Sequence, residues 1–375
     1  MSGEDDIPPE ADRLDGAPHP RETDQIFGQG AAEAAFLGAF TSDRLHHAWL
    51  LTGPRGVGKA TLAWRIARFL LATPPNTGDA LFAAPVPETL DVPPDHPVAR
   101  RLHAMSEPGL MLLRRPWDEK AKRFKAQITV DEVRKLKDFF ALSASDGGRR
   151  VVIVDAADEM NTNAANALLK VLEEPPANVV LLLVGHQPSR LLPTIRSRCR
   201  TLRLDRLSEA DLGRALGQAE IETDASPALA ELAEGSVGEA ARLTALDGLA
   251  LYADLIGLFG SMPGMNRSAA SKLAEAAAAR GAEARFDLTL VLIDRLLSRL
   301  ARTGATGQAP PEIVTGEAQM LTRLAPDPAT GRAWADMAQG LTARARRGKA
   351  VNLDPAALIL DMCLSLEKTA ARIPA

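Results

Sequence analysis

The chain has 375 residues, of which 46% are hydrophobic and 25% charged, and its net charge is −4. This composition is typical of a globular protein of two or three domains and excludes a wholly disordered, collagenous or coiled-coil chain. Its two cysteines, Cys199 and Cys363, cannot form a disulfide framework or a four-cysteine zinc site, so we expect a reducing, cytoplasmic setting. The sequence contains no run of 18 apolar residues and no apolar secretory segment, which predicts no membrane association.

The first 25 residues contain eight acidic and two basic side chains. An acidic, proline-containing segment of this kind buries little apolar surface, so we expect residues 1–25 to form a disordered, solvated tail. The remaining residues are nearly neutral, which argues against a strongly basic, free-standing DNA-binding protein.

Residues 26–205 alternate between short apolar runs and helical patterns. We expect strands over residues 47–52, 110–113, 150–155, 178–184 and 201–204. We expect helices over residues 31–40, 59–71, 130–142 and 163–174, with a proline-rich loop or insertion at 72–98. Continuous apolar strands that alternate with helices predict an α/β domain, in which helices cover both faces of a parallel sheet.

Beyond Asp205 the sequence indicates helices only. Helix-start signals occur at Ser208, at Ser226-Pro227 and at Asp354-Pro355, and residues from 247 onward keep helical apolar spacing. We therefore predict a small helical domain at 206–246 and an all-helical domain at 247–375.

The first expected strand and the helix after it flank a phosphate-binding loop of the form G-x-x-x-x-G-K. The loop comprises Gly53, Pro54, Arg55, Gly56, Val57, Gly58 and Lys59. Its backbone amides, the helix N-terminus and the Lys59 cation would together attract phosphate. The next position normally carries the Ser or Thr that holds Mg²⁺, but here it is Ala60, and Thr61 lies about 100° further around the helix. The alternative is a glycine loop kept for packing after nucleotide use was lost.

A second buried strand ends in Asp155, where folds of this type carry a metal-binding aspartate. The following residue in hydrolytic relatives is usually a glutamate that orients water, but here it is Ala156, and Asp158 and Glu159 lie beyond the strand. Asp155 therefore either serves a nucleotide site or only caps its strand.

Residues 114–137 form the one strongly basic stretch, with nine basic and four acidic side chains. We expect a solvated loop and helix face, and the alternative is a contact surface for nucleic acid or an acidic partner. His46 and His47 lack the spacing of metal ligands, so we expect them to pack or hydrogen-bond at the start of a strand.

Four segments carry a family resemblance when taken together. They are 19–23 (HPRET), 46–59 (HHAWLLTGPRGVGK), 165–176 (ANALLKVLEEPP) and 194–199 (TIRSRC). Over residues 19–246 the chain resembles bacterial clamp-loader AAA+ subunits of the delta prime type. The resemblance implies an AAA+ P-loop NTPase base at 26–205, a lid at 206–246 and a collar at 247–375 through which five subunits assemble.

The resemblance also implies partners and residue roles. The partners would be tau/gamma-type ATPase subunits and a delta subunit, in a hetero-pentamer that loads a sliding clamp onto primed DNA. Within the Ser197-Arg198-Cys199 motif, Arg198 would act as an arginine finger on the ATP of the adjacent subunit. The alternatives are a surface ion pair for Arg198 and, for Cys199, a small buried residue rather than a nucleophile.

The chain departs from the family at Ala60, at Ala156 and at Gly238, where active ATPase subunits carry a lid arginine. The family's four-cysteine zinc module is also absent from residues 72–110. We therefore predict a subunit of the DNA polymerase III holoenzyme that neither hydrolyses ATP nor transfers nucleotides itself, requires no cofactor, holds no zinc and binds ATP and Mg²⁺ weakly at most. The alternatives are an ATP-hydrolysing tau/gamma-type subunit and an interaction protein with a vestigial nucleotide fold.

Overall fold

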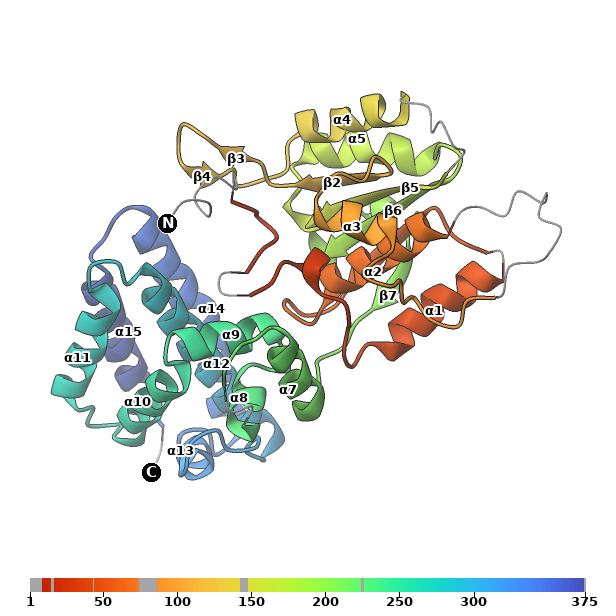
Figure 1. The fold of residues 1–375 in the computed structure, drawn as a ribbon. Coiled ribbons are helices and arrows are strands. Elements are labelled where there is room, and N and C mark those ends of the chain that lie inside the picture. The colour runs from red at the N-terminus through yellow and green to blue at the C-terminus, as the bar shows by residue number, and fades with distance from the viewer. Residues whose placement is uncertain are drawn as a thin grey trace, which may run out of the picture. The chain divides into compact units, whose positions relative to one another are not determined.

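The computed structural model describes residues 9–14, 17–42, 44–73, 86–141, 148–223 and 226–373. The chain divides into two compact units (Figure 1). The sheet unit comprises residues 1–222 with 235–238, and the helical unit comprises residues 223–234 with 239–375. In the described part of the chain no single helix is long and apolar enough to cross a membrane, and only one pair of helices, bent by 79°, meets that test jointly.

The sheet unit is built on five parallel strands in the order β2-β5-β6-β1-β7. These strands are β1 (Ala48–Thr52), β2 (Leu110–Arg114), β5 (Arg150–Asp155), β6 (Val179–Gly185) and β7 (Arg200–Arg203). A separate antiparallel hairpin is formed by β3 (Trp117–Asp118) and β4 (Arg123–Phe124). The main sheet confirms the predicted parallel architecture, and each expected strand is present within one residue of its expected ends.

Helices cover both faces of this sheet (Figure 1). The helices and turns of the unit are η1 (Pro20–Glu22), α1 (Gly30–Thr41), α2 (Lys59–Ala72), α3 (Pro97–His103), α4 (Val130–Ala141), η2 (Ala157–Glu159), α5 (Thr162–Glu173), η3 (Pro188–Arg190), α6 (Pro193–Arg196) and α7 (Glu209–Gln218). Successive strand residues enter opposite cores, since Leu51 and Ile153 pack with α1 and α2, whereas Leu50 and Val154 pack with α4 and α5. This double burial explains why β1, β5 and β6 are apolar along almost their whole length, whereas the edge strand β7 buries only Leu202.

The helical unit contains no strand among its described residues. Its helices are α8 (Pro227–Leu232), α9 (Val237–Ala245), α10 (Gly248–Gly260), α11 (Arg267–Ala278), α12 (Glu283–Thr306), α13 (Glu317–Leu324), α14 (Pro328–Ala350) and α15 (Pro355–Ala370). Asp354 caps α15 by accepting hydrogen bonds from Ala356 N and Ala357 N, as its sequence predicts. The all-helical C-terminal region is thereby confirmed, whereas the expected boundaries at 206 and 246 stay predictions.

Two expectations about irregular segments fare differently. The prediction of a disordered tail over residues 1–25 is wrong for residues 9–14 and 17–25, which the structure describes and which bury His19 completely. Residues 1–8 and 15–16 lie outside the described residues, as do 74–85 of the expected insertion and Leu142 of an expected helix. Residues 86–96 form no helix or strand, and α3 begins at Pro97, inside the segment expected to be a loop.

Candidate functional site

The predicted phosphate loop joins β1 to α2 at the carboxyl edge of the sheet. Gly53 and Gly56 have φ angles of 141° and 77°. A Cβ at Gly53 would lie 2.2 Å from Leu204 O, and a Cβ at Gly56 would lie 2.2 Å from Ser236 Oγ. Only glycine fits both positions, because a side chain would meet backbone strain and a neighbouring atom together.

Lys59 begins α2 and turns its ammonium group back onto the loop. Its Nζ donates hydrogen bonds to Gly53 O at 2.8 Å and to Pro54 O, and the residue is 3% exposed. Burial lowers the pKa of Lys59 to about 8, although Asp155 and Asp158 partly offset the effect. The ammonium group of Lys59 is therefore hydrogen-bonded to carbonyl oxygens of its own loop.

Asp155 closes β5 beside this loop. Burial raises the pKa of its carboxyl group to about 7, and the negative charges of Asp12 and Glu159 add to the effect. Lys59 and Arg55 act in the opposite direction. A carboxyl group that holds its proton to near pH 7 is a poor ligand for Mg²⁺ at lower pH.

The two acids that follow Asp155 have structural partners. Asp158 accepts hydrogen bonds from His186 N at 2.9 Å and from Gln187 N at 3.1 Å, which fixes the end of β6. Glu159 pairs with Arg115 Nε at 2.7 Å. Burial and the nearby cations lower the pKa of His186 to about 4, so this ring is neutral near pH 7.

An acidic segment, residues 10–14, crosses the sheet edge beside the loop. Arg114 ends β2 as the register partner of Asp155, and it binds both Glu10 at 3.0 Å and Asp12. At the other end of the segment, Leu14 Cδ2 lies 3.7 Å from the position that a Cβ would take at Gly238. That same position is 3.6 Å from Gly56 Cα, so residues 10–14 run from Asp155 to the phosphate loop.

His19 anchors this segment to the sheet unit. Its Nε2 lies 3.1 Å from Asp12 Oδ2, its Nδ1 accepts from Arg21 N at 3.0 Å, and its ring meets Trp64 edge-on at 5.6 Å. Burial alone would raise the pKa of Asp12, but His19 and Arg114 outweigh it and lower the pKa below its usual value. This placement of the segment was not predicted, although its acidic charge complements the basic start of residues 114–137.

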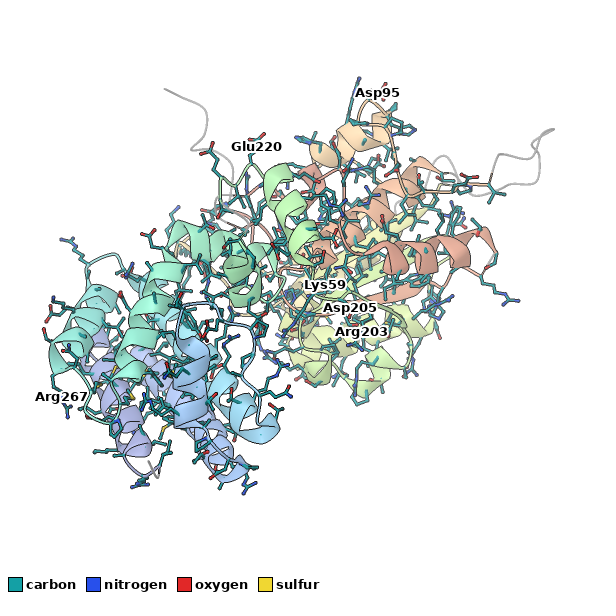
Figure 2. The ribbon with its side chains drawn as sticks, turned by 90° about the horizontal axis from the view of Figure 1, so that it is seen from below. Lys59, Asp95, Arg203, Asp205, Glu220 and Arg267 are labelled. Carbon is teal, nitrogen blue, oxygen red and sulfur yellow. The ribbon has the colours of Figure 1, made fainter. Side chains whose placement is uncertain are left out.

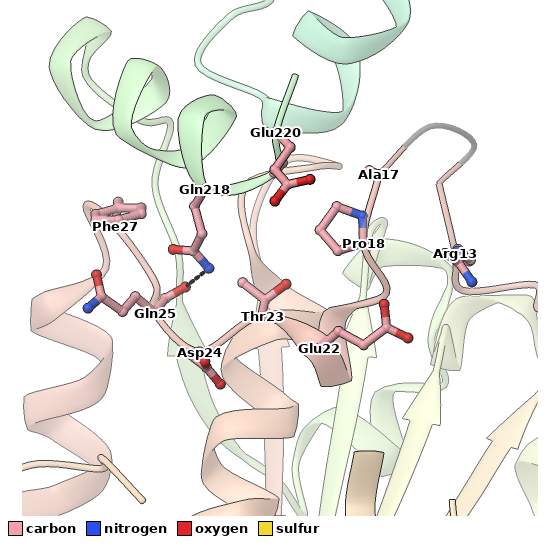
Figure 3. A pocket seen from close by; sticks show the side chains of 11 residues that line it. Arg13, Ala17, Pro18, Glu22, Thr23, Asp24, Gln25, Phe27, Gln218 and Glu220 are labelled. Atoms are coloured by element: carbon pink, nitrogen blue, oxygen red, sulfur yellow. Dashed lines mark hydrogen bonds between the residues drawn. The ribbon is translucent and has the colours of Figure 1, made fainter. Parts of the chain in front are cut away.

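A cavity of about 830 Å³ lies between this N-terminal part of the unit and α7 (Figure 3). Two of its lining residues are joined by a hydrogen bond, which Gln218 Nε2 donates to Gln25 O at 3.3 Å. Ile26 lies between the lining residues Gln25 and Phe27 in the chain and contacts the phosphate loop, since its Cδ1 is 3.2 Å from the position of a Cβ at Gly58. The cavity therefore adjoins the loop through residues 25–29.

Arg198 lies in the other motif that carries the family resemblance. Its Nη2 pairs with Glu173 Oε1 at 2.9 Å, and its Nη1 donates to Thr194 O at 3.0 Å. Ser197 caps α6, with Oγ donating to the same carbonyl at 3.1 Å. Cys199 is partly buried against the core, and burial raises the pKa of its thiol to about 12.

Arg198 lies at the amino ends of the parallel strands, and the phosphate loop lies at their carboxyl ends. Arg200 pairs with Trp49 at the amino end of β1, whereas Arg203 pairs with Thr52 at its carboxyl end. Gly53, the first residue of the loop, accordingly lies against Leu204, which directly follows β7, and Figure 2 labels Lys59, Arg203 and Asp205 in this part of the sheet unit. Strand residues rise about 3.3 Å each, so Arg198 is separated from its own loop by the length of the sheet.

His46 and His47 take the packing role expected for them. Their rings stack at 4.4 Å, His46 Nδ1 accepts from Ala48 N at 3.1 Å, and His47 Nε2 lies 3.0 Å from Leu172 O. Both rings thus fix the start of β1 against the C-terminal turn of α5.

Comparisons with known proteins find similar chains among the subunits of DNA polymerase III. A family model described as "DNA polymerase III, delta subunit" matches residues 28–208. The DNA polymerase III subunit delta' of Pseudomonas aeruginosa is 44% identical over 153 residues, which are 41% of each chain. The corresponding subunit of Bacillus subtilis is 33% identical over 55% of this chain and 56% of its own.

Gamma subunits are also similar. The DNA polymerase III subunit gamma of Buchnera aphidicola is 30% identical over 60% of this chain and 58% of its own. A solved gamma subunit-related protein of Thermotoga maritima superposes with a TM-score of 0.34 at 18% identity, over 89% of this chain and 99% of that chain. The chain spans about half the length of the curated relatives it matches. Residues 28–208 are therefore similar to DNA polymerase III delta-type subunits, which confirms the resemblance to delta prime clamp-loader subunits.

Proposed function

We propose that this chain is a non-hydrolysing delta prime-type subunit of the DNA polymerase III clamp loader. In that complex it would contact tau/gamma-type ATPase subunits and a delta subunit and help to load the sliding clamp onto primed DNA. The family match over residues 28–208 and the relatives named delta' and gamma support membership of such a complex.

The observation that carries the proposal is the position of Arg198. It is held by Glu173 and Thr194 at the amino edge of the sheet, far from the chain's own phosphate loop. An arginine fork in this position can serve an ATP only if a neighbouring subunit supplies the nucleotide. A finger of this kind stabilises charge on the transferring phosphoryl group and typically accelerates hydrolysis by about 10³–10⁵-fold.

Two features at the loop and beside it support the absence of hydrolysis by this chain. Ala60 has no hydroxyl group for Mg²⁺, and the acidic residue Asp12 lies near Asp155. The loop and its neighbouring cavity are consistent with weak ATP or Mg²⁺–ATP binding that is not required for function. No zinc is proposed.

The second candidate is an ATP-hydrolysing tau/gamma-type subunit. The similarity to gamma subunits and the intact G-x-x-x-x-G-K loop favour it. Ala60, Ala156 and Gly238 oppose it, because each lacks the side chain that an active site of this family uses.

The decisive experiment is Arg198→Ala in a complex reconstituted with tau/gamma-type and delta subunits. We expect DNA-stimulated ATP turnover of the complex to fall by the turnover of the one ATP site that Arg198 completes. Size-exclusion chromatography should still show an intact assembly. Turnover in the Arg198→Lys variant should fall nearly as far, because an ammonium group lacks the planar, forked geometry of a guanidinium group.

Arg196→Ala is the matched control. Arg196 is an exposed arginine two residues earlier, at the end of α6, and its loss should leave turnover unchanged. Unchanged turnover in Arg198→Ala would exclude the finger role, and a dissolved assembly would assign Arg198 to subunit contact alone.

A further inference from the structure

The structure divides the basic stretch at residues 114–137 into two parts. Five of its nine bases form ion pairs: Arg114 with Glu10 and Asp12, Arg115 with Glu159, Lys122 with Glu119, Arg134 with Asp131, and Lys135 with Glu132. Within the described part of the chain, Lys120, Arg123, Lys125 and Lys137 form no ion pair. Three of these four lie in or directly beside the β3–β4 hairpin.

The hairpin is a well-built element that adds no strand to the main sheet. Trp117 and Phe124 face each other across it at 5.0 Å, and Lys125 N donates to Pro116 O at 2.9 Å. Asp118 Oδ1 accepts from Lys120 N and Ala121 N at 3.0 Å each, which fixes the turn. These hydrogen bonds and the basic neighbours Lys125 and Arg123 lower the pKa of Asp118.

The tip therefore carries four exposed basic side chains against two acidic ones, Asp118 and Glu119, so its net charge is positive. Lys120, Lys122, Arg123 and Lys125 are all exposed, and Lys122 has only Glu119, 3.4 Å away and itself exposed, as a partner. The other acid of the turn, Asp118, is engaged with backbone amides. Figure 1 shows the hairpin projecting from the end of β2, clear of the helices that cover the sheet.

We infer that the β3–β4 hairpin is a DNA-binding element that grips the phosphate backbone through Lys120, Lys122, Arg123 and Lys125. A two-stranded β-ribbon fits the major groove of duplex DNA, and exposed lysine and arginine side chains supply sequence-independent affinity for phosphates. Trp117, the partly exposed tryptophan beneath these bases, is placed to report the contact. The inference concerns this chain's own surface and does not depend on Arg198 or on partner subunits.

Binding is measured with the full-length chain and fluorescein-labelled DNA, as a 30-nucleotide single strand and as a 30-base-pair duplex, by fluorescence anisotropy between 25 and 200 mM NaCl. The variant is Lys120→Ala/Lys122→Ala/Arg123→Ala/Lys125→Ala. We expect at least a tenfold loss of affinity at about 50 mM salt and a salt slope shallower by about 3, as four lost phosphate contacts imply. Single-strand and duplex arms show which form the hairpin prefers.

The control removes the same charge elsewhere on the sheet unit, through Arg100→Ala/Arg134→Ala/Lys135→Ala/Lys137→Ala. It should keep at least a third of the wild-type affinity, which separates a local contact from a change of net charge. Intrinsic fluorescence gives a second readout, because Trp49, Trp64 and Trp334 are buried and DNA should change the signal of Trp117. Trp117→Phe should abolish that change.

Three outcomes overturn the inference. The first is no binding of either DNA by the wild-type chain at 25 mM salt, and the second is equal loss of affinity in both quadruple variants. The third is unaltered DNA binding by the hairpin variant; if that variant also loses its association with tau/gamma-type subunits, the hairpin is assigned to an acidic protein partner. Circular dichroism and thermal melting confirm that each variant is folded.

Discussion

Asp155 shows how burial beside the predicted phosphate loop affects a single side chain. In the unfolded chain its carboxyl group ionises near its usual pKa of 3.8, whereas in the folded protein it holds its proton to about pH 7. Between these values only the unfolded state has released the proton. The free energy of unfolding contributed by this group therefore falls as the pH rises from about 4 to about 7 and is constant above that range.

Asp155→Asn removes this penalty. We expect the stability of the variant relative to wild type to increase by on the order of 2 kcal/mol between pH 5 and pH 7.5. Urea denaturation at the two pH values measures the difference. Asp205→Asn replaces an exposed aspartate of the same unit, and its difference in unfolding free energy from wild type should be the same at the two pH values. If the difference for Asp155→Asn is also independent of pH, the Asp155 carboxyl group is not protonated in the folded protein.

At the scale of elements, α12 and α14 approach each other closely at two glycines, Gly304 and Gly331. A Cβ at Gly304 would lie 2.6 Å from Gly331 Cα and 2.7 Å from Asp327 O. Side chains at this crossing would separate the helices, which form the most extensive helix pair of the helical unit. The glycines thus set the distance between the two longest helices in the described part of the chain.

Gly304→Ala should therefore destabilise the helical unit by about 1–3 kcal/mol, as overpacking of an interior does. Gly340→Ala is the matched control, because Gly340 lies in α14 with nothing within 4 Å of its added Cβ. It should stabilise the helix by about 0.5–1 kcal/mol through lower backbone entropy in the unfolded chain. Thermal unfolding followed by circular dichroism compares them, and equal shifts of the same sign would refute the close crossing as the cause.

At the scale of the whole molecule, the two edges of the sheet differ in what they can do. The carboxyl edge holds a glycine loop whose lysine is bound internally and whose entrance is crossed by residues 10–14. The amino edge exposes Arg198 beside Glu173. This division is what we expect of a chain that, as proposed above, acts on a neighbour's nucleotide rather than on its own.

The purified chain alone should accordingly turn over ATP only at background, with Mg²⁺ and primed DNA present. Ala60→Thr combined with Ala156→Glu and Gly238→Arg restores the three missing side chains and should raise Mg²⁺-dependent nucleotide affinity, measured by calorimetry. Adding Lys59→Ala to this variant should cancel the gain. Robust, Lys59-dependent turnover by the wild-type chain would contradict the non-hydrolysing proposal.

The sequence determined the elements whose physical signal is local. Each buried strand of the main sheet is a continuous apolar run, and each long helix repeats apolar residues every three to four positions, so both could be predicted from neighbouring residues alone. The glycine loop and its missing hydroxyl at Ala60 were equally visible, because the chemistry depends on fixed spacing. The two-residue strands β3 and β4 were not, because they are too short to show a period.

Which distant residues meet could be learned only from the folded chain. Arg114 and Asp12 are 102 positions apart, and their pairing places part of the predicted solvated tail beside the predicted phosphate loop. The same folding left the hairpin bases exposed while it neutralised their neighbours in sequence. Charge composition is a sum over residues, whereas its effect depends on distance, and distance is set by the packing of the whole sheet unit.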